Sequence, residues 1–206
     1  GGGAANKWFV GTAVFNAGTR SAYISNNSSA NAYTVNDPRV QHFYRDITFP
    51  AGQTNITISF NWKGVAEACC DYFRVHLVPT TTTPAAATLL TTGFITGNLN
   101  NQATWQSATY QIPCTAAGTT QRLVFTFRSD GSLGTQPPPA VDNISVVSAV
   151  AGTCLASLGS GNVAIASLPY ASGATTTCGN SDNVTATNAP VCGSTNYYGG
   201  EDNVYE

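Results

Sequence analysis

Apolar and polar side chains alternate along several short segments of this chain, and this two-residue period restricts the fold more than any other feature. Along segment 71–78 every second residue is apolar, as at Phe73, Val75 and Leu77. Further strand candidates are 20–25, 42–49, 54–60, 121–128 and 141–147. No segment combines a 3.6-residue period with helix caps. The pattern predicts an all-β protein, either an antiparallel jelly roll or another β-sandwich.

The alternation also predicts which side chains face the core and which face away from it. In segment 71–78, Tyr72 and His76 have the opposite parity to the apolar set, so both are expected on the outer surface. The side chains expected to point inward from the other segments are Phe43, Ile47, Phe49, Ile56, Ile58, Phe60, Leu123, Phe125, Phe127, Ile144 and Val146.

Charged residues make up only 9% of the 206 residues, against roughly 25% in an average soluble protein. The net charge of -2 creates no field that would gather nucleic acid, and no run is long enough to insert in a membrane. Thr, Asn, Ser and Gly supply most of the polar character, and the six cysteines form an even set. This composition indicates an oxidising compartment, so an extracellular or cell-surface location is expected.

The candidates for disulfide bonds are Cys69, Cys70, Cys114, Cys154, Cys178 and Cys192. The adjacent Cys69 and Cys70 either bond to each other or bond to two different partners. Cys178 and Cys192 flank a loop that a disulfide would close, at a gain of about 3 kcal/mol. Cys154 is left for Cys114 or another cysteine of the first module. Six cysteines allow about 15 pairings, so the connectivity stays open.

A change of amino-acid composition near residue 150 predicts two structural units. Residues 1–148 form the first, 149–153 a small uncharged linker, and 154–206 the second. The second unit contains no Lys, Arg, Trp or Phe, and about 53 residues are too few for a full sandwich. Its last residues, 202–206, have the pattern of an opening strand. We therefore expect an incomplete second β-sandwich, completed by something outside this chain.

Several motifs occur in an order that resembles a known family. They include Lys-Trp-Phe-Val-Gly-Thr-Ala at 7–13, Asp-Tyr-Phe-Arg-Val at 71–75 and Val-Asp-Asn-Ile-Ser at 141–145. Over residues 6–148 the chain resembles the MAM-like jelly roll, or choice-of-anchor module, of secreted Bacteroidota surface proteins. The tail resembles the start of a β-sandwich found at the C-termini of secreted peptidases, through segments 167–170, 177–179 and 200–205.

The resemblance implies a function without catalysis, because both kinds of module occur in long surface adhesins and as accessory parts of secreted enzymes. We expect a structural or adhesive module, acting as a repeat unit or subunit of a bacterial surface filament or long adhesin. Its partners would be neighbouring copies or modules, surface glycans or surface proteins. The alternative is a ligand- or carbohydrate-binding accessory module of a secreted hydrolase.

The sequence departs from the family at both ends. The jelly roll usually opens with another apolar-aromatic strand ahead of Lys7, and only residues 1–5 stand there. The chain is therefore expected to be an excerpt of a longer protein, or a subunit that takes a missing strand from a neighbour. An open sheet edge carries unpaired N–H and C=O groups, and strand donation uses them.

Three charged residues share strand parity with apolar ones: Arg45, Asp71 and Asp142. A buried charge needs a partner, and two arrangements supply one. Asp71, Asp142 and Glu67 form a candidate Ca²⁺ site, completed by backbone carbonyls. The favoured alternative is a structural ion pair of Arg45 with Asp71 or Asp142, because buried charges are usually paired.

The residue types needed for catalysis are scarce, and no enzymatic activity is expected. A cysteine nucleophile would need one of the two histidines, His42 and His76, as a positioned base. Carboxylate pairs for glycoside hydrolysis could come from Glu67, Asp71, Asp130 and Asp142, without an evident groove. Outward-facing aromatics such as Tyr72 could stack on sugars, but isolated surface tyrosines are common.

Overall fold

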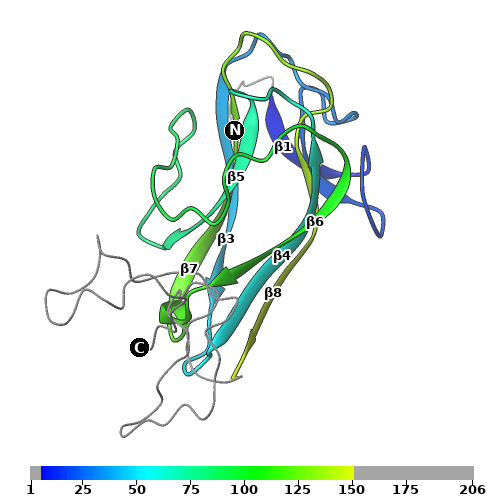
Figure 1. Cartoon of the computed structure of the whole chain (residues 1–206). Helices are drawn as coiled ribbons and strands as arrows, with labels where there is room; N and C mark the ends of the chain where they lie inside the picture. The colour runs from blue at the N-terminus through cyan, green and yellow to red at the C-terminus, as the bar shows by residue number, and fades with distance from the viewer. Residues whose placement is uncertain (1–5, 151–206) are drawn as a thin grey trace, which may run out of the picture. The chain divides into compact units, whose positions relative to one another are not determined.

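The computed structural model describes residues 6–150, and within them nearly all regular structure is β (Figure 1). The elements are β1 (Lys7–Gly11), β2 (Ser21–Ser25), β3 (Arg39–Thr48), β4 (Asn55–Gly64), β5 (Tyr72–Pro79), β6 (Gln102–Ile112), a 3₁₀ turn (Cys114–Ala116), β7 (Thr120–Ser129) and β8 (Ala140–Ala149). No helix in this part of the chain has the length and apolar character to cross a membrane. The predicted linker beyond Val150 and the predicted second unit lie outside the described residues.

The strands form two antiparallel sheets that face each other. The five-stranded sheet has the order β1-β2-β8-β4-β6, and the three-stranded sheet has the order β3-β7-β5. Segment 93–99 adds to the free edge of β5, where the Ile95 N–H donates to the Val75 carbonyl at 2.9 Å. Counting this segment, β2-β8-β4-β6 lies opposite a second set of four, which is a jelly-roll arrangement. The predicted all-β antiparallel fold is confirmed.

The core lies between the sheets and includes most of the side chains that the alternation selected. On β4, Ile56, Ile58 and Phe60 are at most 2% exposed. The Phe60 ring meets those of Phe125 and Phe73 edge-on, with centroids 5.6 Å and 6.4 Å away. Such packing buries most of each ring, and each large apolar side chain contributes about 1.5–3 kcal/mol.

The expectation that His76 and Tyr72 face solvent is wrong. His76 is 1% exposed and Tyr72 is 5% exposed. The long connection from β5 to β6 leaves the sandwich on the outer side of the three-stranded sheet (Figure 1). The Thr92 carbonyl from this connection lies 2.9 Å from Nδ1 of His76. Strand parity therefore gave the correct face of β5, and the covering connection made that face an interior.

Ile144 and Val146 point inward as expected, but they are not both buried. Both line a cleft between the sheets, but Ile144 is 42% exposed. The cause is that β8 lacks a neighbouring strand on one side of this part, as described below.

Replacing Phe125 by alanine is expected to lower the free energy of unfolding by about 3–5 kcal/mol, because the ring is 2% exposed at the centre of the aromatic cluster. Phe94→Ala is the control, since the Phe94 ring is 50% exposed and is expected to cost much less. Urea unfolding of both variants gives the comparison. Equal costs would contradict the packing.

Candidate functional site

Three carboxylates meet at one end of the sandwich. Asp71 precedes β5 and Asp130 follows β7, and these antiparallel neighbours pair Tyr72 with Arg128 at that end. Glu67 comes from the loop between β4 and β5. One ligand oxygen from each of the three lies within 4.8 Å of the others. The structure thus joins two of the predicted metal ligands, Glu67 and Asp71, with Asp130.

Asp71 is fully buried and is held by two donors. The Tyr33 hydroxyl donates to Oδ2 at 2.6 Å, and the Asp130 N–H donates to Oδ1 at 2.9 Å. Burial raises the pKa of Asp71, although both donors act to lower it. Burial, together with the hydrogen bond to Asp71, also raises the pKa of Tyr33. Gly134 is needed here, because a Cβ at this position would collide with the Tyr33 hydroxyl.

Glu67 carries the polar atom that the site leaves unsatisfied. Its Oε2 is buried and has no hydrogen-bond partner. Burial raises the pKa of Glu67, and the negative charges of Asp130 and Asp71 raise it further. Oxygen ligands of this kind suit Ca²⁺, which takes six to eight of them and tolerates irregular geometry. Glu67, Asp71 and Asp130 are therefore the residues that could hold a divalent cation.

Asp142 does not belong to this cluster. Its Oδ2 accepts the N–H groups of Asn16 at 2.7 Å and Ala17 at 3.0 Å, and its Oδ1 accepts the N–H of Asn143. The carboxylate therefore fixes the loop ahead of β2. The predicted combination of Asp142 with Asp71 and Glu67 is not formed.

The favoured ion pair is not formed either. Among residues 6–150, the Arg45 guanidinium has no hydrogen bond or ion pair, and Asp71 is satisfied by a tyrosine instead. The error arose because strand parity was taken to place Arg45 close to the acids. It lies near the opposite end of β3 from the acidic cluster.

The loop that carries Glu67 is held by a disulfide and by hydrogen bonds. Cys69 and Cys70 form a disulfide with each other, so the alternative that they bond to two different cysteines does not occur in the structure. The Asn100 amide donates to the Glu67 carbonyl at 2.6 Å, and Arg128 donates to the Cys70 carbonyl. Cys114 is also disulfide-bonded. Cys154, Cys178 and Cys192 lie outside the described residues.

Both histidines hold the β5–β6 connection against the sheet. Nε2 of His42 lies 3.1 Å from the Ala85 carbonyl and 3.0 Å from that of Thr88. His76 contacts the Thr92 carbonyl, as noted above. Burial lowers the pKa of each imidazole. These contacts indicate a structural role for both histidines, which is to hold the β5–β6 connection in place.

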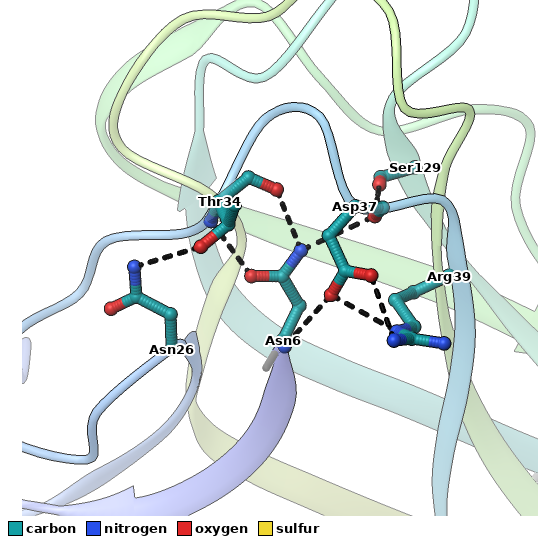
Figure 2. A network of polar contacts seen from close by, with 6 residues as sticks. All are labelled: Asn6, Asn26, Thr34, Asp37, Arg39 and Ser129. Atoms are coloured by element: carbon teal, nitrogen blue, oxygen red, sulfur yellow. Dashed lines mark hydrogen bonds and ion pairs between the residues drawn. The ribbon is translucent and has the colours of Figure 1, made fainter. Parts of the chain in front are cut away.

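A polar network around the buried Asn6 closes the sandwich near the acidic cluster (Figure 2). The Asn6 amide donates to the Thr34 carbonyl at 2.8 Å, and its oxygen accepts the Thr34 N–H at 2.8 Å. The Asp37 carboxylate accepts a hydrogen bond from the Asn6 N–H and forms an ion pair with Arg39. The Ser129 hydroxyl donates to the backbone carbonyl of Asp37. The network joins the start of β1 to loop 26–38 and to the ends of β3 and β7.

The sandwich is closed next to this network and open farther along. Next to the network, Trp8 of β1 covers β3 by donating to the Gln41 carbonyl at 3.2 Å. Farther along, a cleft of about 560 Å³ opens between β3 and β8. Its lining includes Phe43, Arg45, Ile47, Leu123, Ile144 and Val146.

No protein-family model and no curated protein matches the chain. Among solved structures it is similar to the enzymatically active domain of tailspike protein 4 from bacteriophage CBA120, with a TM-score of 0.42, covering 70% of this chain and 18% of that one. It is also similar to the CBM22-1 xylan-binding domain of Paenibacillus barcinonensis Xyn10C, with a TM-score of 0.41, covering 73% and 85%. A cleaved adhesin domain of Lys-gingipain from Porphyromonas gingivalis w83 has a TM-score of 0.34, covering 63% and 74%. Each shares 12% sequence identity with this chain.

Tyr33→Phe is expected to destabilise the protein by about 1.5–3 kcal/mol, because it removes a hydrogen bond to a buried carboxylate. The pKa of Asp71 should rise further in this variant, which NMR titration would detect. Tyr110→Phe is the matched control, since burial alone raises the pKa of Tyr110. A cost for Tyr33→Phe no larger than for the control would contradict the assigned role.

Glu67→Gln tests the acidic cluster. Because the pKa of Glu67 is raised in the folded state, stability in EDTA should fall as the pH rises from the ordinary value of 4.5 through the folded value. The variant should flatten this fall and have a higher Tm at pH 7. A hundredfold excess of Ca²⁺ over its Kd should raise the wild-type Tm by roughly 5–10 °C and leave the variant almost unchanged.

Asp46→Asn is the control for this experiment. The hydrogen bond from Arg122 lowers the pKa of Asp46 below its ordinary value of 3.8. The ionised carboxylate therefore stabilises the fold at pH values above 3.8, and the asparagine variant should be less stable there. The Ca²⁺ response should remain. Equal Ca²⁺ responses in the wild type and Glu67→Gln would remove the cluster as a cation site.

Proposed function

We propose that this chain is a non-catalytic structural or adhesive module of an extracellular bacterial surface protein. It acts as a repeat unit or subunit of a filament or long adhesin, of the MAM-like kind that its motifs resemble. Its low charge and its disulfides support an extracellular setting. Ca²⁺ bound by Glu67, Asp71 and Asp130 would hold the loops at one end of the module.

The free edge of β6 carries this proposal. β6 pairs with β4 on one side, and no strand of residues 6–150 pairs with its other side. Its eleven residues include no charged residue and no proline. Proteins that avoid edge-to-edge association usually place such residues on their edges. A neighbouring copy or module can therefore extend the sheet by pairing with β6.

The alternative, a carbohydrate-binding accessory module, receives less support from the site. Tyr72, one of its expected stacking platforms, is 5% exposed and lies under the Arg74 guanidinium, 4.7 Å from the ring centroid. Tyr44 is 46% exposed, but the Arg122 guanidinium covers its ring at 4.4 Å. In both cases an arginine occupies a ring face on which a sugar could stack.

A double variant, Thr104→Lys with Thr109→Lys, tests association through β6. Both threonines are exposed on the strand, and lysines on an edge oppose pairing with another strand. Sedimentation over a range of concentrations should show association of the wild type, weakened roughly tenfold or more in the variant.

The control places two lysines on the neighbouring central strand, as Thr57→Lys with Ser59→Lys. Ser59 lies directly opposite Thr109 and Thr57 lies opposite Gln111, so the control adds the same charge beside β6 but leaves the edge intact. It should associate like the wild type. A wild type that stays monomeric at all concentrations, or equal effects of both variants, would refute association through β6.

A further inference from the structure

A second free edge lies on the other side of the five-stranded sheet, along residues 143–149 of β8. β4 pairs with this part of β8 from Ser59 opposite Ser145 to Asn55 opposite Ala149. On the opposite side, β2 reaches only Ala140 and Val141. Within the described residues, the outer N–H and C=O groups of 143–149 therefore have no strand partner.

The local backbone separates the paired part of β8 from the unpaired part. Asn143 has a φ of 51°, in the left-handed region, and the register of β4 against β8 shifts between Ser59 and Asn61. Such a bulge bends a strand and changes its twist. β8 thus turns away from the line of β2 at the point where the pairing with β2 ends.

Beyond the bulge, the free edge lacks the charged residues and prolines that protect many edges from pairing. Its sequence, Asn-Ile-Ser-Val-Val-Ser-Ala, contains no charge and no proline. Val147 is 59% exposed and Ile144 is 42% exposed. Seven residues span roughly 20–24 Å of strand, which is enough to pair with a heptapeptide.

The cleft between β3 and β8 lies beside this edge. Ile144 and Val146 line it from β8, and Ile47 lines it from β3. Side chains normally fill the space between packed sheets to high density. An added strand on β8 would point every second side chain into the cleft, where apolar groups fit.

Arg45 gives the cleft a charge preference. Its side chain lines the cleft, is exposed, and has no hydrogen bond or ion pair with residues 6–150. The neighbouring Asp46 accepts two hydrogen bonds from Arg122, at 2.7 Å and 3.0 Å, so its charge is already paired. A carboxylate entering the cleft would form a charge-assisted hydrogen bond with Arg45.

We propose that the β8 edge and its cleft accept an extended peptide segment by β-strand addition. The bound strand pairs its backbone with residues 143–149, places apolar side chains at alternate positions in the cleft, and presents one acidic side chain to Arg45. A row of free backbone groups favours a peptide over a sugar or a lipid, because only a peptide backbone can continue the ladder of hydrogen bonds. This site goes beyond the proposed self-association, since it does not involve β6.

The probes are three fluorescent heptapeptides, each blocked at both ends, with Ser or Thr at odd positions. Valine occupies two of the even positions and glutamate the third, at position two, four or six. Anisotropy titrations use the full chain carrying Thr104→Lys and Thr109→Lys, so that β6 pairing does not interfere. At least one peptide should bind with a Kd of roughly 1–100 μM.

The role of the Arg45 charge is tested by reversing the charge on Arg45 and on the peptide. Arg45→Glu should weaken binding of the glutamate peptide about tenfold or more, and a lysine version of the peptide should regain affinity for that variant. Arg20→Glu makes the same charge change at an exposed residue that does not line the cleft, and should leave binding unchanged. A lysine peptide that binds the parent chain as well as the glutamate peptide would overturn the assignment of Arg45.

Backbone pairing is tested by N-methylation at alternate residues. Methyl groups on the set of N–H groups that faces β8 should abolish binding, while methyl groups on the other set should not. Equal behaviour of the two methylated peptides, or no binding by any peptide, would refute strand addition.

A second copy of the chain is the competing occupant. If the parent with both lysines on β6 still dimerises, and Val147→Lys separates the dimer, the edge belongs to another copy and the peptide proposal fails. The result at the β8 edge does not decide the proposed function. Association through β6 is tested separately, by comparing the wild type with the Thr104→Lys, Thr109→Lys variant.

Discussion

The backbone N–H and C=O groups at the edges of the sheets are the constraint on which this structure depends, because each group must meet a partner or water. At the edge of β5 the partner is segment 93–99, which the chain supplies before it crosses to β6. Near one end of β3, the Trp8 indole and the Asn6 network cover the gap between the sheets. Among the strand edges that lack such cover within residues 6–150, β6 and residues 143–149 carry no charge, and these are the surfaces to which the function is assigned.

The acidic cluster shows how a chain with few charges can bury one of them. Asp71 stands directly before β5 with the parity of the core residues, so its carboxylate points inward. Tyr33, from a distant loop, supplies the hydroxyl that offsets the loss of water. The Asp130 N–H supplies the second donor, and the same residue adds a third carboxylate beside Glu67. Satisfying Asp71 therefore brings together the oxygens that a cation would need.

Alternation along the chain was sufficient to predict the sandwich and most of its core. β4, β5 and β7 read correctly because their inner faces carry large apolar residues at every second position, as at Ile56, Ile58 and Phe125. β6 was missed as a full strand, because it is rich in Gln, Thr, Ser and Ala, which hide the period. The burial of His76 could not be predicted from β5, since a connection remote in sequence covers it.

Of the candidate cation site, Glu67 and Asp71 were predicted as ligands, whereas Asp130 was named only among the carboxylates considered for hydrolysis. The signal for Asp130 was present: an acid after one strand and an acid before another meet when the strands are antiparallel neighbours. Using it requires knowing that β5 pairs with β7, which the residues themselves do not state. Asp142 was misplaced for the same reason, because its strand belongs to the opposite sheet, where loop amides satisfy it.

The position of the two free edges limits the kinds of assembly that the module can form. Pairing of β6 with β6 of a second copy would be isologous, and such a contact closes at a dimer. A filament needs a second, different surface that continues growth. β6 and β8 belong to the same sheet with β4 between them, and residues 143–149 face away from β6. Association through β6 alone therefore ends at a dimer, and β8 would continue growth only where the peptide segment that it accepts belongs to a different chain of the assembly.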